Sequence, residues 1–487
     1  MMSNITKIIC CIILGGAIAL VVALVVPVLS NLEVLAFLAI SAMVLFLILV
    51  WLTNKEQFVS FFILFLPLIP LFQALLPHEV QNDLGVDVLF MEMLFGGGLL
   101  ILWLTKRNIG LSTIEYQKDF KAFKTIISIW VFLNLLPTLF SMDIYRSLML
   151  FLIGVFEPAL VFFLIVGKTR VNRKMLLSLL LGLIGSGIVL VLLGFAFKFV
   201  AAARIGVNFL LLREGDIYGS NAVIGAIAFL LPLVFMGSRH WHGYWPQSVF
   251  NIFRIVLFLF TLLSLVWIIT ALSRWGYVTF AAAFLLALFF DRGYSKLRWV
   301  VPLAAALLLF MLFFPEHIRE VITYRFTQGQ PLTWESVLQV AQADARWDIW
   351  QNAWDYFKDN IVVGVGLGNH FAISPQRFTT AHNIFLNMLV ERGILVSMAF
   401  VIVIAFFYKL NFQFRRKAKD QNLRRLSLFL GIGMMTFLVW ALTGGDLIQA
   451  RGFISAIPAH YFSVILGLQL YIIKLDCLAK GTKRGEI

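Results

Sequence analysis

Long apolar runs are the feature that most limits how this chain of 487 residues can fold. About fourteen such runs follow one another, each with roughly 17–25 residues and so long enough to cross a bilayer. Over such a run in lipid, only an α-helix satisfies every backbone hydrogen-bonding group. Hydrophobic residues make up 61% of the chain and charged residues 13%, a balance that excludes a soluble globular protein. We therefore expect an all-α, polytopic membrane protein with about fourteen transmembrane helices.

The expected spans cover most of the chain, which we treat as one helical membrane domain over residues 1–487. They are residues 8–29, 33–52, 58–76, 88–104, 124–140, 148–166, 175–200, 219–237, 252–272, 275–290, 298–314, 383–408, 426–443 and 453–473. The first run leads at once into the second and lacks a cleavage site, which favours a retained span over a signal peptide. Ser273 and Arg274 separate two runs that could instead form one long bent segment.

Lysines and arginines gather in alternate connectors, and this bias predicts the orientation, since basic loops stay cytoplasmic. The basic connectors are residues 106–124, 168–174 and 409–425 and the tail at 480–484. Both termini are then expected in the cytoplasm, and the connectors expected outside are 77–87, 141–147, 201–218, 273–274, 315–382 and 444–452. The net charge of +14 fits this topology and anionic headgroups better than a nucleic-acid partner.

One long polar insertion, residues 315–382, separates the eleventh expected span from the twelfth and is expected to form an extracytoplasmic cap. Asp344 is a candidate N-cap for a helix that runs to about Phe357. Helical spacing predicts that one face of it carries Arg346, Trp350, Ala353, Trp354 and Phe357. The glycine-rich turn GVGLG follows at 364–368, and His382 and Asn383 then begin the next apolar run. A cation, a flexible backbone and an imidazole therefore occur in one insertion, where we expect function.

Several other signals do not indicate a site. The glycine-rich turn lacks the spacing and the βαβ setting of a nucleotide-binding loop. None of the three cysteines, Cys10, Cys11 and Cys477, is placed for an external disulfide or a zinc cluster. Glu92 and Glu157 lie within apolar runs, and a structural role, protonated or paired, is favoured over a functional one. We expect no metal ion and no cofactor.

The chemistry open to an outward-facing membrane site is limited, because no nucleotide is available there. A group-transfer enzyme at that face needs a donor that was activated beforehand, such as a lipid diphosphate. Arginine suits such a donor because its planar fork binds phosphate oxygens bidentately and keeps its charge as the phosphate leaves. Histidine can act as a base for an acceptor hydroxyl near neutral pH.

Three separated motifs carry a resemblance to a known family. They are TALSRWG at 270–276, RWDIW at 346–350 with the turn at 364–368, and AHNIFL at 381–386 leading to ERGIL at 391–395. In this order and spacing they resemble the O-antigen ligase and polymerase superfamily of bacterial membrane glycosyltransferases. The resemblance covers about residues 250–410. The amino-terminal half shares only the many-span architecture.

The resemblance implies roles for named residues. Arg274 and Arg346 would bind the diphosphate of an undecaprenyl-diphosphate-linked glycan, and His382 would activate the acceptor hydroxyl, without a metal ion. Weaker candidates for donor binding are Arg204, Arg213 and Arg377. Structural interpretations stay open, since an arginine at a helix end often extends to the headgroups and His382 could cap the following helix.

The implied function is polymerisation of lipid-linked repeat units of a cell-surface or cell-wall polysaccharide, such as a teichuronic-acid-like or capsular chain, at the bacterial cytoplasmic membrane. A ligase that delivers the glycan to a terminal acceptor such as lipid A core stays open, although the number of spans favours a polymerase. A lipid-linked glycan transporter, or flippase, is the alternative of another class, but the sequence lacks the two related halves expected of one. Expected partners are the lipid-linked donor, a glycan or lipid-glycan acceptor and membrane lipids. A flippase or a chain-length regulator stays open as a further partner.

Overall fold

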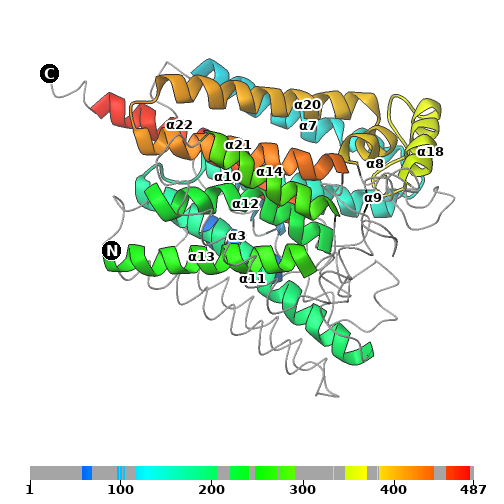
Figure 1. The fold of residues 1–487 in the computed structure, drawn as a ribbon. Coiled ribbons are helices and arrows are strands. Elements are labelled where there is room, and N and C mark those ends of the chain that lie inside the picture. The colour runs from blue at the N-terminus through cyan, green and yellow to red at the C-terminus, as the bar shows by residue number, and fades with distance from the viewer. Residues whose placement is uncertain are drawn as a thin grey trace.

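The computed structural model describes residues 58–68, 96–97, 99–100, 103–104, 117–205, 220–240, 247–270, 274–290, 333, 346–369, 381, 383–443 and 457–482. Every regular element in these ranges is helical (Figure 1), so the expected all-α class is confirmed. The expected spans at 8–29, 33–52 and 298–314 lie outside these ranges. The total number of spans therefore stays a prediction.

Six helices within the described ranges are long and apolar enough to cross a membrane. They are Gln117–Leu139, Ile144–Gly167, Arg173–Ala196, Ile384–Lys417, Gln421–Leu442 and Ile457–Ala479. Shorter apolar helical stretches are Val223–Val234, Arg254–Ile268 and Gly276–Phe290. All nine fall on spans that the sequence predicts. The chain is a polytopic membrane protein.

The helices follow one another in this order. They are α3 (Phe58–Phe65), the short η1 (Leu66–Leu68), α7 (Gln117–Leu133), α8 (Leu135–Leu139), α9 (Ile144–Phe151), the π-helical η2 (Leu152–Phe156), α10 (Glu157–Gly167), α11 (Arg173–Ile205), α12 (Ser220–His240), α13 (Gln247–Thr270), α14 (Arg274–Phe290), α18 (Arg346–Asp359), α20 (Ile384–Lys417), α21 (Gln421–Thr443) and α22 (Ile457–Thr482). Helices α13 and α14 lie on the two runs on either side of Ser273, and residues 271–273 between them are outside the described ranges.

Small residues let the helices of the bundle approach closely. A Cβ added to Gly433 of α21 would lie 2.7 Å from the backbone oxygen of Phe229 in α12. The rings of Phe229 and Phe437 stack there with centroids 4.1 Å apart. Packing contacts between small and aromatic residues are a main source of helix association in lipid, where burial from water contributes little.

The carboxylate of Glu157 is buried beside an imidazole. Its Oε2 lies 3.8 Å from Nε2 of His460, and both side chains are only 1% exposed. Glu157 begins α10 directly after the five π-helical residues of η2, and the next residue is Pro158, which has no N–H to donate. The pair joins α10 to α22 inside the bundle.

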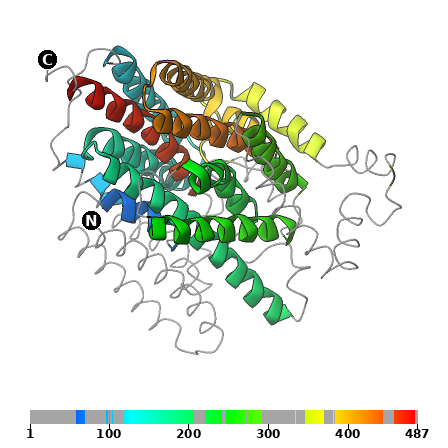
Figure 2. The same ribbon diagram turned by 60° about the vertical axis from the view of Figure 1, so that its left-hand side comes forward.

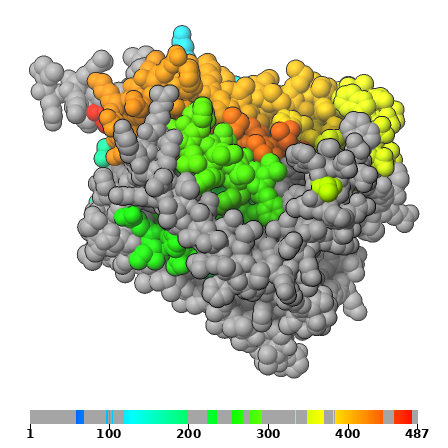
Figure 3. Space-filling model, viewed as in Figure 1, coloured from blue at the N-terminus to red at the C-terminus, as the bar shows by residue number. Residues whose placement is uncertain are grey.

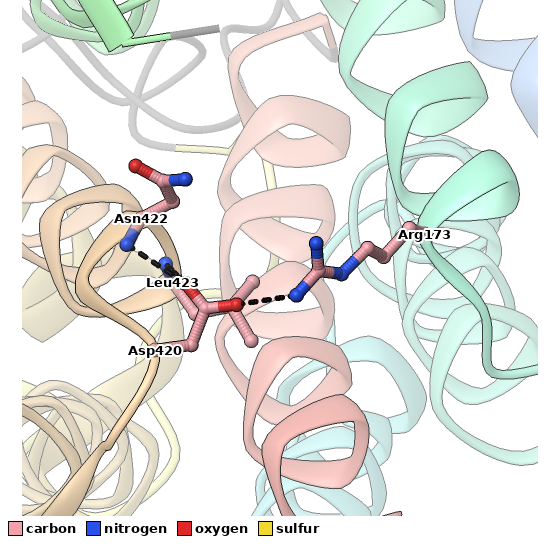
Figure 4. Close-up of polar contacts among 4 residues, drawn as sticks. All are labelled: Arg173, Asp420, Asn422 and Leu423. Carbon is pink, nitrogen blue, oxygen red and sulfur yellow. Dashed lines mark hydrogen bonds and ion pairs between the residues drawn. The ribbon is translucent and has the colours of Figure 1, made fainter. Parts of the chain in front are cut away.

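The basic connectors meet at one end of the bundle. Arg173 pairs with Asp420 at 2.7 Å, and Asp420 also accepts hydrogen bonds from the first backbone N–H groups of α21 (Figure 4). Lys409 pairs with Asp119 at 3.0 Å. The hydroxyl of Tyr471 donates to the carbonyl of Arg170 at 2.6 Å. Connectors that the charge bias assigns to a common side thus lie together, while the side of the membrane that they face stays a prediction.

The insertion lies at the other end of the long helix α20. Figure 1 shows α18 beside the start of α20, far from the junction between α20 and α21. The turned view shows α18 on the periphery of the helical bundle (Figure 2). In the space-filling view, described residues of the insertion continue the surface of α20 (Figure 3). The fold therefore presents the insertion at the end of the bundle away from the basic connectors.

Candidate functional site

Helix α18 is amphipathic and packs one side against α20. Its buried residues are Ile349, Ala353 and Phe357, which recur every four residues and contact Val365 and Val390. Asp348 in its first turn and Lys358 in its last turn complement the helix dipole. The expected helix is thus confirmed, and the structure adds which of its sides is buried. Trp354 is 47% exposed, and Asp344 lies outside the described residues.

The glycine-rich turn fits against an interruption in α20. Gly393 has φ +71° and ψ −178°, and the backbone around it leaves the helical path. The carbonyls of Val390 and Glu391 accept hydrogen bonds from the N–H groups of Val365 and Gly366, at 2.9 and 3.0 Å. The N–H of Ile394 in turn donates to the carbonyl of Ile361 at 2.8 Å. Backbone groups freed by the interruption are therefore satisfied by the turn.

Glycine is required on both sides of this contact. Gly364 has φ +74°, and a Cβ on it would lie 2.5 Å from the backbone carbon of Glu391. A Cβ on Gly393 would lie 2.5 Å from the backbone carbon of Val362. Two glycines with positive φ thus allow two backbones to meet without side chains between them.

The connector between α8 and α9, together with the first turn of α9, contacts the other side of the turn. The hydroxyl of Ser147 donates to the carbonyl of Leu367 at 2.8 Å, and it also lies 2.6 Å from the hydroxyl of Ser141. The amide of Asn369 donates to Ser141 and to the carbonyl of Val365. We call these contacts between residues 141–147 and 365–369 the cap junction. Two connectors that the sequence predicts on the same side of the membrane meet there.

Three sets of hydrogen bonds fix the start of α20 and the residues before it. The indole N–H of Trp350 donates to the carbonyl of Ala381 at 2.7 Å, and the N–H of Ala381 donates to Oδ1 of Asn387 at 2.9 Å. Asn383 caps α20, since its Oδ1 accepts from the N–H groups of Phe385 and Leu386. Asn383 thus has the capping role that the alternative interpretation gave to its neighbour in the sequence.

The sequence segment that contains these contacts matches a known family. Residues 258–401 match the family model described as O-antigen ligase. This segment is similar to the O-antigen ligase family. The match confirms the resemblance to the ligase and polymerase superfamily. Comparison with curated proteins gives no match.

The matched segment contains the second half of α13, α14, α18, the glycine-rich turn and the first half of α20. Its family implies a membrane glycosyltransferase of the ligase or polymerase type that acts on lipid-linked glycans. The helices on either side of the matched segment extend the same membrane bundle. The arrangement therefore combines a membrane-spanning scaffold with a compact set of contacts at one end.

For three of the expected binding residues the structure describes the backbone position only. Arg274 is the first residue of α14 and Arg346 the first residue of α18, while Arg204 is next to the last residue of α11. Their side chains are outside the described part, as are three whole residues, His382, Arg213 and Arg377. The hydrogen bond from Trp350 brings the helix that starts at Arg346 to Ala381, directly before His382.

Arg392 is a buried cation that is not among the candidates predicted from the sequence. Arg392 on α20 is 1% exposed, and its Nη1 donates to Oδ1 of the fully buried Asn134 at 3.1 Å. A charged residue inside an apolar run is a functional candidate by default, so its place beside Gly393 in the ERGIL motif was a usable signal. Its partner was not recognisable, because Asn134 is 258 residues away along the chain.

Proposed function

We propose that this chain polymerises lipid-linked repeat units of a cell-surface or cell-wall polysaccharide on the outer face of the bacterial cytoplasmic membrane. The donor in this proposal is an undecaprenyl-diphosphate-linked glycan, and the acceptor is another lipid-linked repeat unit. The hydrogen bond from Trp350 to Ala381 carries the proposal. It holds the helix headed by a proposed diphosphate ligand, Arg346, against the segment that contains the proposed base, His382.

Donor binding is assigned to Arg274 and Arg346. Both begin a helix, where backbone N–H groups and the helix dipole also favour an anion. Two guanidinium groups would balance much of the diphosphate charge in a place with little water. In this proposal transfer needs neither a metal ion nor another cofactor. Arg204, at the end of α11, and Arg213 and Arg377 are secondary candidates for the same donor.

Transfer is a single displacement at the sugar carbon that carries the diphosphate. The acceptor hydroxyl oxygen forms the new bond to that carbon, while the bond from the carbon to the diphosphate oxygen breaks. His382 takes the hydroxyl proton, and undecaprenyl diphosphate leaves with its charge held by the arginines. The contacts of Ala381 and Asn383 on either side of His382 would limit where its ring can lie.

A ligase is the second candidate function. The matched family is described as O-antigen ligase, and a ligase would use the same donor and the same residues. It differs in the acceptor, which would be a terminal molecule such as lipid A core. The number of apolar runs in the sequence is larger than the resemblance implies for a ligase, and this favours the polymerase. A lipid-linked glycan transporter is the candidate of another class.

The experiment that tests the proposal uses purified protein in lipid vesicles with undecaprenyl-diphosphate-linked repeat units as the only glycan. Nucleotide sugar is left out and a chelator is present. A ladder of longer lipid-linked products that is lost in His382→Ala supports the polymerase. Donor that is consumed only after a different acceptor is added identifies a ligase. Donor that crosses the vesicle bilayer without being consumed contradicts both enzymes and identifies a transporter.

A further inference from the structure

The interruption at Gly393 divides α20 into two helical pieces. The long piece continues to Lys417, while the short piece covers residues 384–392, about two and a half turns. The N–H of Ile394 donates to the carbonyl of Ile361, which lies just before the glycine-rich turn, rather than back along the helix. The short piece directly follows His382 and Asn383, so its direction decides where His382 lies.

Most of the described hydrogen bonds on the short piece join it to the insertion. The backbone of Val390 and Glu391 bonds the glycine-rich turn, and Asn387 bonds Ala381. These hydrogen bonds fix the short piece relative to the insertion, which is itself bonded to Ser141 and Ser147 at the cap junction.

Arg392 makes the described hydrogen bond that reaches from the short piece to the membrane helices. Its guanidinium donates to Asn134, which lies between α7 and α8. Asn134 is itself held, because its amide donates to the carbonyl of Trp130 at 2.7 Å and its carbonyl accepts from Thr138 at 2.9 Å. A buried guanidinium is costly unless it is hydrogen-bonded, so loss of this contact is unfavourable.

We propose that Arg392, acting through Asn134, is a positioning residue for glycan transfer. It fastens the short piece of α20 to the junction of α7 and α8 and so fixes the height and direction of the segment that carries His382. The inference rests on the proposed function, in which His382 activates the acceptor. Arg392 touches neither donor nor acceptor in this scheme. It acts through the helix that it orients.

The test removes both partners of the contact at once. The double variant Arg392→Met/Asn134→Leu removes both partners of this hydrogen bond, so neither is left buried without the other, and it is expected to fold to normal abundance. Its turnover number is expected to fall about tenfold or more while the KM for the lipid-linked donor changes less than about twofold. Arg392→Lys, which keeps a donor, is expected to recover part of the loss. The two single variants should each lose as much turnover as the double variant, because both break one contact.

A control on the same helix separates positioning from general loosening of α20. Asn411 is buried beyond the interruption and donates to Ser427 and Gln469 at 3.0 Å, so Asn411→Leu removes a comparable contact away from the site. It is expected to lower thermal stability and leave the turnover of the folded protein unchanged. A double Arg392/Asn134 variant with wild-type turnover would overturn the proposal, as would an equal loss in Asn411→Leu.

A second measurement separates failure of this inference from failure of the proposed function. The rate at which diethyl pyrocarbonate modifies His382, followed by mass spectrometry, does not depend on glycan transfer. The Arg392/Asn134 double variant is expected to change this rate about threefold or more, and Asn411→Leu is expected to leave it unchanged. If wild-type protein does not consume the donor, the proposed function fails, and an altered labelling rate still supports positioning. If the wild-type protein is active and the double variant is labelled at an unaltered rate, the positioning role of Arg392 is rejected and the proposed function still stands.

Discussion

The indole nitrogen of Trp350 lies 2.7 Å from the carbonyl oxygen of Ala381, across 31 residues of the chain. This hydrogen bond is the described side-chain link between the cap helix and the segment that leads into α20. It couples the helix on which one proposed diphosphate ligand lies to the backbone next to the proposed base.

Replacing Trp350 with phenylalanine removes this hydrogen bond and keeps most of the aromatic packing. A hydrogen bond of this kind contributes about 0.5–1.5 kcal/mol, so turnover is expected to fall roughly two- to tenfold. Steady-state kinetics with the lipid-linked donor would measure it. The matched control is Trp354→Phe, since that side chain is 47% exposed and should change turnover little. Equal effects of the two variants would argue against a special role for the bond to Ala381.

Arg346→Ala is expected to abolish transfer, because the diphosphate would lose a bidentate cation. Arg346→Lys should restore only part of the activity, since lysine keeps the charge without the fork. Lys358→Ala is the control at the other end of the same helix, where an exposed pair with Asp355 contributes little. Product formation at equal protein abundance is the measurement. Full activity of Arg346→Ala would remove Arg346 from the donor site.

His382→Ala is expected to lower turnover about 100-fold or more while donor affinity stays near the wild-type value. Added imidazole should restore part of the turnover, because a free base can occupy the space that the side chain leaves. Asn383→Ser is the control, since serine keeps the N-cap of α20 and should retain activity. Lost donor binding with normal chemistry would assign His382 to the donor instead.

Gly393→Ala is expected to destabilise the insertion, because alanine is strained at φ +71° and its Cβ would overlap Val362. Backbone strain of this type costs about 1–3 kcal/mol. The melting temperature in detergent should fall, and activity should fall with it. Gly97→Ala is the control, since a Cβ there meets nothing within 4 Å. A Gly393→Ala protein as stable as Gly97→Ala would contradict the contact with the turn.

Cysteine labelling in intact cells tests the orientation. In a chain without Cys10, Cys11 and Cys477, the variant Gln351→Cys presents a thiol on the exposed side of α18 and should react with an impermeant reagent. Gln421→Cys, at the basic end, should react only after the membrane is permeabilised. The opposite pattern would invert the topology.

The helical class and the position of each described span could be predicted from hydropathy, because lipid imposes one solution on a long apolar run. The ends of the spans were predicted less accurately. The span expected at 383–408 continues as helix to Lys417, because its last turn is basic and hydropathy records only the apolar part of a helix. The side of α18 that is buried was left open by the sequence: it carries Ile349, Ala353 and Phe357, while Trp354 is exposed. Helical spacing defines faces but does not say which face another element covers.

The contacts of the candidate site were beyond reach of the sequence for a different reason. The motifs at 346–350 and 381–386 were recognisable, because they are continuous. The pairing of Arg392 with Asn134, and of Ser147 with Leu367, joins segments more than 200 residues apart. Such pairs depend on the order in which membrane helices pack, which neither periodicity nor composition encodes.

The cap junction also decides which parts of this chain can be exchanged with a relative. A chimera that received only the insertion would face Ser141 and Ser147 with side chains and turns selected in another protein. A graft that exchanges the insertion therefore has to carry two discontinuous segments, residues 134–147 and 346–394. In this protein the unit that can be exchanged is a pair of distant stretches rather than one loop.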